Sequence, residues 1–255
     1  MPILAPLLGG LVLAVAGWRG IFWVLTSFGV AVGIAVLFGL RESRTEETAA
    51  VAAAETPFQT YALLLKERRL LGYMLAGGFN SACLFTYIAL SPELVIGRYG
   101  IDAQHFGWIF GINAAALIGA SQINRILLRR WTSDRVLAAA TTAVVGFGAI
   151  LATAGVSGIG GMWAVLVPLF FVVGSFGFIF ANSAAGALSV DPLRSGSVSA
   201  LTGASGFIIG ALVSVVAGLL PGGPAAAMGV TMFVAVCLSA MSLFLLALRP
   251  APSAA

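Results

Sequence analysis

Ionisable side chains are the first candidates for proton or ion chemistry, and in this sequence they avoid the middle of every long apolar run. Glu93 and Asp191 each stand at the end of such a run, and His105 lies in a loop without a second histidine nearby. An ionisable residue inside a membrane-crossing segment generally marks an ion or proton pathway. We therefore interpret Glu93, Asp191 and His105 as solvated helix-end or loop residues and not as proton carriers or ligands.

The residue types that carry catalysis do not occur in the required combinations. The sequence has no phosphate-binding glycine loop, no His/Cys cluster and no serine–histidine–aspartate arrangement. Cys83 and Cys237 each fall within an apolar run, so we interpret them as small core residues. The sequence therefore predicts neither an enzyme nor a bound metal or cofactor.

Neutral polar and aromatic residues form stripes at helical spacing. Tyr73, Asn80 and Tyr87 are seven residues apart and would share one face of a helix. Asn113 is eleven residues from Asn124 and nearly aligned with it on the next helix. A third stripe contains Phe171, Ser175, Phe178 and Asn182.

These stripes predict a cavity that binds amphiphilic organic molecules, because aromatic rings supply contact area and amides give or accept hydrogen bonds. The alternative is that the amides hydrogen-bond across helix interfaces and hold the helices together. Both uses require amides that face inward, so the sequence leaves the two alternatives open.

The composition defines the setting of these residues. Hydrophobic residues make up 60% of the 255-residue chain and charged residues 9%, with a mean hydropathy of +1.06. An ordinary globular protein has about 45–50% and about 25%, so a soluble fold could not cover this much apolar surface. The net charge is +4. We attribute it to membrane topology and expect the lipid bilayer, not nucleic acid, as the partner of this chain.

Eight apolar runs predict an all-α membrane protein with eight transmembrane helices. All but the first have about 20 residues or more, enough to cross about 30 Å of hydrocarbon, and they lack the alternation of a membrane barrel. The first run resembles the second half of a helix. The runs are 2–16, 20–40, 70–90, 106–128, 136–156, 162–188, 198–220 and 225–248.

The long connection 41–69 separates residues 1–40, which we interpret as the remnant of one helix bundle, from a six-helix bundle at 70–249. Thr56-Pro57 is a favourable helix start. One face of that helix, with Phe58, Tyr61, Ala62 and Leu65, predicts an interfacial helix. An early start of the following span is the alternative.

Basic residues are distributed unequally between the two sides of the predicted membrane, eleven against two. The excess marks the cytoplasmic side, which places the C-terminus in the cytoplasm. The eleven are Arg41, Arg44, Lys66, Arg68, Arg69, Arg125, Arg129, Arg130, Arg135, Arg194 and Arg249, and the two are Arg19 and Arg98.

Small residues line one face of the seventh run. Gly203, Gly206 and Gly210 would allow close approach of another helix, and Gly206-x-x-x-Gly210 fits a helix-packing motif. Packing within the chain and dimerisation are the two alternatives, and we favour the first.

Several short segments follow one another along nearly the whole chain. They are Ala5-Pro6-Leu7-Leu8-Gly9-Gly10, Gly17-Trp18-Arg19-Gly20-Ile21-Phe22, Phe85-Thr86-Tyr87-Ile88, Ser91-Pro92, Tyr99-Gly100, Phe106-Gly107, Asn113, Asn124-Arg125 and Arg194-Ser195-Gly196-Ser197-Val198-Ser199-Ala200-Leu201-Thr202-Gly203. In this order they are similar to the Bcr/CflA drug-resistance branch of the major facilitator superfamily. The first resembles the antiporter motif of the fifth family helix through Ala5, Pro6, Gly9 and Gly10, with Ala5 where the family favours glycine.

The resemblance implies a twelve-helix transporter of two six-helix halves in the bacterial inner membrane, exporting drugs in exchange for protons. This chain would correspond to helices five to twelve, a partial major facilitator fold. The family's coupling residues lie in the first four helices, so the resemblance implies proton coupling through that missing half and a chain that is inactive alone. The alternative is a membrane protein without transport activity that binds partners through its helix faces.

Overall fold

The computed structural model describes residues 4–40 and 45–248, and within these ranges every regular element is a helix. Seven helices are long and apolar enough to cross a membrane. The sequence predicts eight runs, and the difference lies at the beginning of the chain. The first two runs fall within one helix, α1 (Leu4–Gly39), whose span Leu8–Gly39 counts once.

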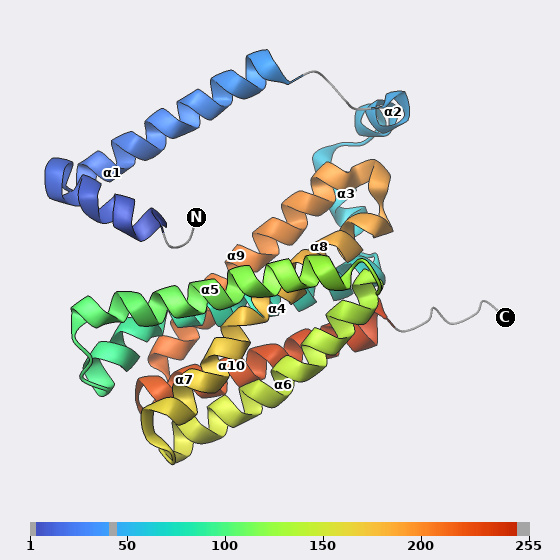
Figure 1. Ribbon diagram of the computed structural model, residues 1–255. Coiled ribbons are helices and arrows are strands. Elements are labelled where there is room, and N and C mark those ends of the chain that lie inside the picture. The colour runs from blue at the N-terminus through green and yellow to red at the C-terminus, as the bar shows by residue number, and fades with distance from the viewer. Residues whose placement is uncertain (1–3, 41–44, 249–255) are drawn as a thin grey trace. The chain divides into compact units, whose positions relative to one another are not determined.

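Helix α1 is nevertheless broken at Gly17, between the two predicted runs. Gly17 has φ 65° and ψ −177°, a backbone conformation that only glycine adopts without strain. The chain therefore changes direction there, and the two arms of α1 run in different directions (Figure 1). Residues 1–50 form one compact unit and residues 51–255 form the other.

The connection between the units contains two short helices, α2 (Glu46–Ala54) and α3 (Pro57–Leu64). The α3 start is as predicted. Thr56 Oγ1 accepts a hydrogen bond from the Gln59 backbone N–H, and Gln59 Oε1 accepts one from the Thr56 N–H. Leu64 is buried, whereas Phe58 is 83% exposed. Because α3 ends at Leu64 and the next helix begins at Arg68, α3 is a separate helix and not an early start of that span.

Six membrane-length segments follow and form a bundle. They are α4 (Arg68–Pro92) with the π-helical turn η1 (Glu93–Arg98), α5 (Ala103–Leu127), α6 (Ser133–Ser157), α7 (Gly161–Gly174) with α8 (Phe176–Val190), α9 (Ser195–Leu219) after the 3-10 turn η2 (Pro192–Arg194), and α10 (Gly223–Ser242) with the π-helical turn η3 (Leu243–Ala247).

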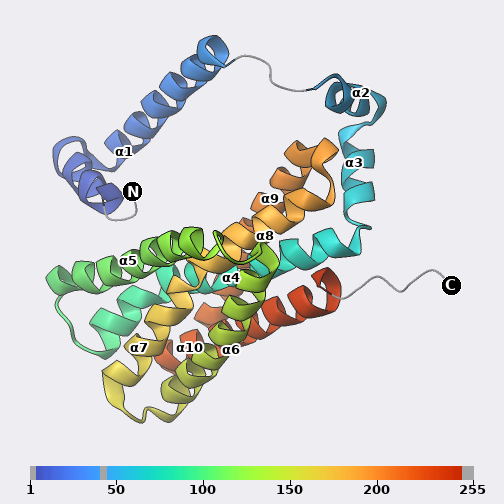
Figure 2. The same ribbon diagram turned by 45° about the vertical axis from the view of Figure 1, so that its right-hand side comes forward.

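Helix α4 is the centre of this bundle, because it packs against α8, α9 and α10. Helix α6 packs along α10 on one side, and α7 and α8 lie between α5 and α6 (Figures 1 and 2). The sixth predicted run thus consists of two helices that meet at Ser175. Together they form one membrane-length span, Gly161–Val190.

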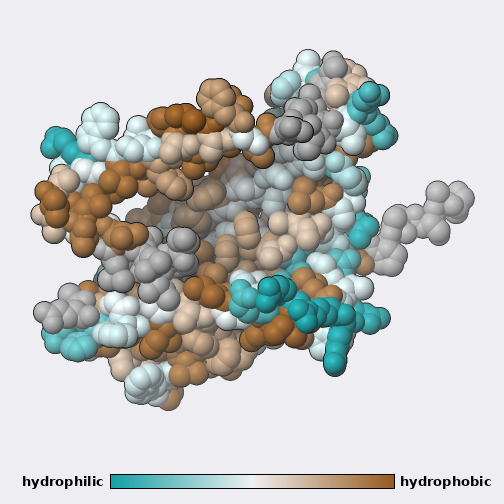
Figure 3. Space-filling view, turned by 45° about the horizontal axis from the view of Figure 1, so that its top comes forward, coloured by the Kyte–Doolittle hydropathy of each residue, from teal (hydrophilic) through white to brown (hydrophobic). Residues whose placement is uncertain are grey.

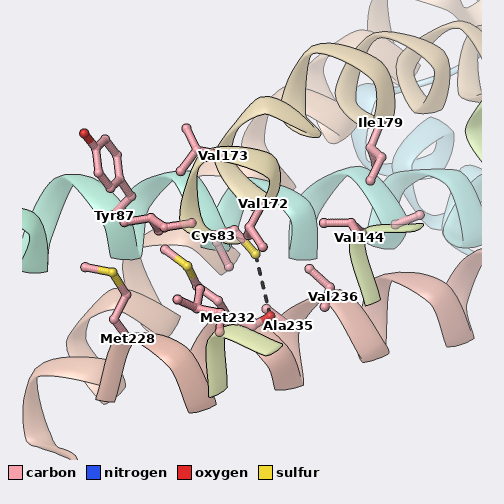
Figure 4. Packing of buried hydrophobic residues seen from close by; sticks show 14 of the residues in the cluster. Cys83, Tyr87, Val144, Val172, Val173, Ile179, Met228, Met232, Ala235 and Val236 are labelled. Atoms are coloured by element: carbon pink, nitrogen blue, oxygen red, sulfur yellow. Dashed lines mark hydrogen bonds between the residues drawn. The ribbon is translucent and has the colours of Figure 1, made fainter. Parts of the chain in front are cut away.

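The core lies where α4, α7 and α10 meet. Met228 and Met232 from α10 pack beneath Cys83 and Tyr87 of α4 (Figure 4). The Cys83 thiol donates to the Met232 carbonyl at 3.8 Å, which makes Cys83 the core residue that the sequence predicts. Both cysteines are free.

The surface carries many large apolar side chains. Phe207, Leu219, Trp163 and Leu212 are all more than 60% exposed. Hydrophobic residues are spread over much of the face in Figure 3, and the most hydrophilic ones form a few patches, the largest at its lower right. Large exposed apolar areas on these spans are the surface that a bilayer covers.

Candidate binding site

The three predicted residues of α4 share one buried face, as their spacing predicts, but each contacts a different neighbour. Tyr73 lies at the end of α4 where the chain enters the bundle. Its hydroxyl donates to Asp134 Oδ1 at 2.7 Å, and Arg69 Nη2 donates to the Tyr73 oxygen at 3.4 Å. Its ring lies where a Cβ on Gly186 would be. Tyr73 therefore joins α4 to the start of α6 and to α8.

Asn80 lies about two helical turns further along α4 and contacts the junction of α7 and α8. Its Nδ2 donates to Ser175 Oγ at 3.2 Å, and Ser175 Oγ in turn donates to the Val172 carbonyl at 2.6 Å. The side-chain oxygen of Asn80 is buried without a hydrogen-bond partner among the described residues. The first and third predicted stripes thus meet at Asn80 and Ser175.

Asn182 of α8 has its hydrogen-bonding capacity occupied by neighbouring helices. Its Nδ2 donates to Asn124 Oδ1 at 2.8 Å and to the Phe178 carbonyl at 2.9 Å. Its Oδ1 accepts from Ser133 Oγ at 2.9 Å. Asn124 and Asn182 therefore act as the alternative interpretation expects, as bonds between helices. Ser133 gave no signal in the sequence, because it looks like any residue at a helix start.

The C-terminal half of α4 presents an aromatic and amide cluster. Tyr87 stacks on Phe110 of α5 with ring centroids 5.4 Å apart and an interplanar angle of 20°. The Asn113 side chain lies next to the Tyr87 hydroxyl, and its Nδ2 donates to the Ile109 carbonyl at 3.0 Å. The Tyr87 hydroxyl and Asn113 Oδ1 are both buried without a well-formed partner among the described residues. The Tyr87 hydroxyl points away from the methionines of α10 (Figure 4).

Phe110 is absent from the predicted set, although it stands three residues before Asn113 on the same helix face. That spacing was the available signal. Buried polar atoms without partners are costly unless something fills their bonding capacity. The cluster of Tyr87, Phe110 and Asn113 therefore combines stacked rings with buried oxygens whose bonding capacity is unfilled among the described residues.

The predicted aromatic residues of α7 and α8 line a different space. A groove of about 390 Å³ runs between α5 and α6 with α7 and α8 as its floor. Phe171 stacks on Phe147 there at 4.4 Å between ring centroids. Its lining is almost entirely apolar and contains three of the predicted residues, Phe171, Ser175 and Phe178.

Comparison with known proteins decides the family. The model of the Major Facilitator Superfamily matches residues 1–215 of this chain. The chain belongs to the major facilitator superfamily. Members of this superfamily are transporters and not enzymes, and the chain is accordingly a multi-pass membrane protein.

Named relatives in the superfamily include drug-resistance proteins. The chain is 27% identical over 97% of its length to the bicyclomycin resistance protein homolog of Haemophilus influenzae, and 25% identical over 80% to multidrug resistance protein MdtL of Klebsiella pneumoniae. It is 29% identical over 95% to the uncharacterized MFS-type transporter YdgK of Bacillus subtilis. The chain spans 62%, 50% and 60% of the lengths of these three relatives, respectively.

The segment that resembles the family's antiporter motif falls in α1. Ala5 and Pro6 belong to its first turns, but their side chains lie outside the described part. At Gly9 and Gly10 no atom among the described residues lies within 4 Å of an added Cβ. The close helix packing predicted at Gly9 and Gly10 thus has no partner in the described structure, and it stays a prediction.

The small residues of α9 divide between two environments. An added Cβ at Gly206 would lie 3.2 Å from Ser81 Oγ, and one at Gly210 would overlap the Phe85 ring. An added Cβ at Gly203 meets open space. In this structure Gly206 and Gly210 pack against α4 within the chain. The described residues contain no group of three or more His, Cys, Asp or Glu side chains that could hold a metal ion.

Proposed function

We propose that this chain supplies the second helix bundle of a multidrug efflux transporter that exchanges substrate for protons. The names of the relatives in Haemophilus influenzae and Klebsiella pneumoniae support drug export. The observation that carries the proposal is the cluster around Tyr87. It combines two stacked aromatic rings with buried polar oxygens that have no well-formed partner in the described part of the chain.

Within this proposal Asn80, Tyr87 and Asn113 contact the substrate directly. Each has a buried side-chain oxygen that lacks a well-formed partner among the described residues and would accept a hydrogen bond from a substrate donor. Tyr73 and Asn182 position helices, because their polar groups are already bonded to other side chains. Apolar ring area and a few convergent polar groups are the usual chemistry of a small-molecule site.

Proton coupling in this proposal depends on residues outside the bundle of residues 68–247. In the described spans of this bundle the ionisable residues stand near the ends, and Asp191 is already bound by Arg194 at 2.7 Å. Alternating access requires two bundles that move around a shared site. The bundle is therefore inactive alone and exports substrate only with a complementary first bundle.

The test measures drug resistance in bacteria that lack their own efflux pumps. The chain is expressed alone, and also fused to the first four helices of the Haemophilus relative. We expect resistance only from the fusion, and loss of that resistance in Tyr87→Phe and Asn113→Leu variants at equal membrane expression. Phe207→Leu is the control, because Phe207 of α9 is 68% exposed and the substitution keeps an apolar side chain there.

Full resistance from the fusion carrying both Tyr87→Phe and Asn113→Leu would show that neither residue contributes to substrate binding. Resistance from the chain alone would show that residues 1–255 contain a coupling group. Membrane insertion of the fusion without any transport would favour a partner-binding protein.

A further inference from the structure

The groove between α5 and α6 is not explained by the proposed transport function. Drug-binding pockets contain a few polar groups that orient the ligand. In this groove the Ser175 hydroxyl is already bonded to the Val172 carbonyl and to Asn80. The remaining lining is apolar apart from the Trp131 indole. Such a lining suits a hydrocarbon chain, which needs no polar partner.

One end of the groove adjoins a concentration of positive charge. Trp131 and Leu127 line that end, and a backbone hydrogen bond of 2.9 Å from the Trp131 N–H to the Leu127 carbonyl holds the turn between α5 and α6. Arg129 and Arg130 lie in this turn and are exposed to solvent.

The arginines of this region have no acidic partner among the described residues. The neighbouring carboxylate, Asp134, is bonded to the Tyr73 hydroxyl and lies 3.7 Å from Arg69 instead. Within the described structure, neither Arg129 nor Arg130 forms an ion pair, and the same is true of Arg125 and Arg135. An anion placed at the turn would therefore meet uncompensated positive charge.

We propose that the groove and this turn together form a binding site for an anionic phospholipid. An acyl chain lies in the groove along Phe171 and Phe178, and the phosphate lies at Arg129 and Arg130. Trp131 is 52% exposed and lines the groove next to these two arginines. Indole rings favour the membrane interface, where the acyl chain and the headgroup of a lipid meet. Basic pockets between transmembrane helices bind anionic headgroups in this way. The proposal holds whatever substrate the chain transports.

The test uses the full 255-residue chain with Trp131 as its only tryptophan, the other four being replaced by phenylalanine. The chain is reconstituted in vesicles that contain dibrominated phosphatidylglycerol or dibrominated phosphatidylcholine, whose bromine atoms quench indole fluorescence on contact. We expect phosphatidylglycerol to bind at Trp131 about fivefold more strongly than phosphatidylcholine, the effect of about one arginine at a membrane surface. A chain retaining only Trp108 should show no such preference.

Matched variants separate the headgroup from the acyl chain. Arg129→Gln with Arg130→Gln should abolish the preference at Trp131, whereas Arg19→Gln with Arg98→Gln removes the same charge and should leave it unchanged. Gly119 lines the groove and has open space at its Cβ, as does Gly111 outside it. Gly119→Phe should therefore reduce quenching by both lipids, and Gly111→Phe should not.

Three results would overturn the proposal. The first is a preference for phosphatidylglycerol that survives loss of Arg129 and Arg130. The second is equal quenching in the Gly119→Phe and Gly111→Phe chains. The third is recovery of Trp131 fluorescence on addition of ethidium, because a cationic amphiphile that displaces the lipid would identify a drug site. The arginine variants lie in an exposed turn, so their result stands even where Gly119→Phe fails to fold.

Discussion

Arg194 joins two carboxylates that are far apart in the sequence. Its Nε donates to Glu55 Oε2 at 2.9 Å and its Nη1 to Asp191 Oδ2 at 2.7 Å. Thr60 Oγ1 donates to the same Glu55 carboxylate at 2.9 Å. The hydrogen bond from Arg194, followed by the one from Thr60, lowers the pKa of Glu55 from 4.5 to about 2. Arg194 therefore joins Glu55, which lies just before α3, to Asp191 in the connection between α8 and α9.

The pH dependence of this tie follows from the lowered pKa. A carboxylate whose pKa is lower in the folded state stabilises that state above its unfolded pKa, and the effect is lost as the pH falls through the folded pKa. We expect a spin label at Phe58→Cys to become more mobile between pH 4.5 and pH 2. Glu55→Gln should give the mobile spectrum throughout, and Glu46→Gln should behave as the unmodified chain does. A spectrum independent of pH would contradict the tie.

The identity of the buried polar residues could be predicted from the sequence, but their partners could not. Helical spacing placed Tyr73, Asn80 and Tyr87 on one buried face, where the structure has them. Spacing does not determine how two helices are rotated relative to each other. The hydrogen bonds that join Asn182 to Asn124 and to Ser133 could therefore not be predicted from the sequence. Glu55 was missed for the same reason.

At the scale of helices, the seam between α6 and α10 depends on missing side chains. An added Cβ at Gly229 would lie 2.8 Å from the Leu151 carbonyl oxygen and 3.0 Å from Ala152 Cα, both backbone atoms of α6 that cannot move aside easily. An added Cβ at Gly148 would lie 2.9 Å from Val236 Cγ2. The two helices are therefore in backbone contact along this seam.

Gly229→Ala should destabilise the bundle by about 1–3 kcal/mol, the usual cost of overpacking a close contact. Gly146→Ala is the matched control in α6, because nothing lies within 4 Å of its added Cβ. That variant should gain up to about 1 kcal/mol from the higher helix propensity of alanine. Unfolding in mixed micelles measures the free energy of unfolding of both variants. Equal values would show that α6 and α10 are not closely packed at Gly229.

Helix boundaries were predictable where local chemistry sets them. The Thr56-Pro57 start of α3 and the break between the first two apolar runs both appear in the structure. The division of the sixth run at Ser175 was not predicted, because neither flanking residue breaks the apolar pattern. The groove above it was also missed, since it depends on how far apart α5 and α6 lie on their common floor.

For the whole molecule, the distribution of basic residues leads to a prediction about orientation. Eleven of the thirteen belong to the connections that we place in the cytoplasm, and Arg98 belongs to the opposite end of the bundle. In a chain without native cysteines, we expect a membrane-impermeant thiol reagent added to intact cells to label Asp102→Cys and not Arg130→Cys. Both positions are exposed to solvent. Labelling of Arg130→Cys alone would invert the orientation.

The superfamily itself was predictable from short segments spread along the chain, and the family comparison confirms it over residues 1–215. The drug, the coupling ion and the direction of transport depend on contacts that no single chain segment encodes. They remain part of the proposed function.

The junction at Ser175 should make the span formed by α7 and α8 easier to bend than the neighbouring pair α6 and α10. Pro168 removes one backbone donor from α7, and the Ser175 hydroxyl bonds the Val172 carbonyl, so this span can bend where α6 and α10 cannot slide. The hydrogen bond from Asn80 Nδ2 to Ser175 Oγ joins this junction to α4, so we expect its loss to widen the range of bend angles. Spin labels at Trp163→Cys and Leu188→Cys should give a distance distribution that broadens with Asn80→Ala, while labels at Ile150→Cys and Val230→Cys should keep a narrow one. Equal widths in both pairs would mean that the bundle moves as one stiff body.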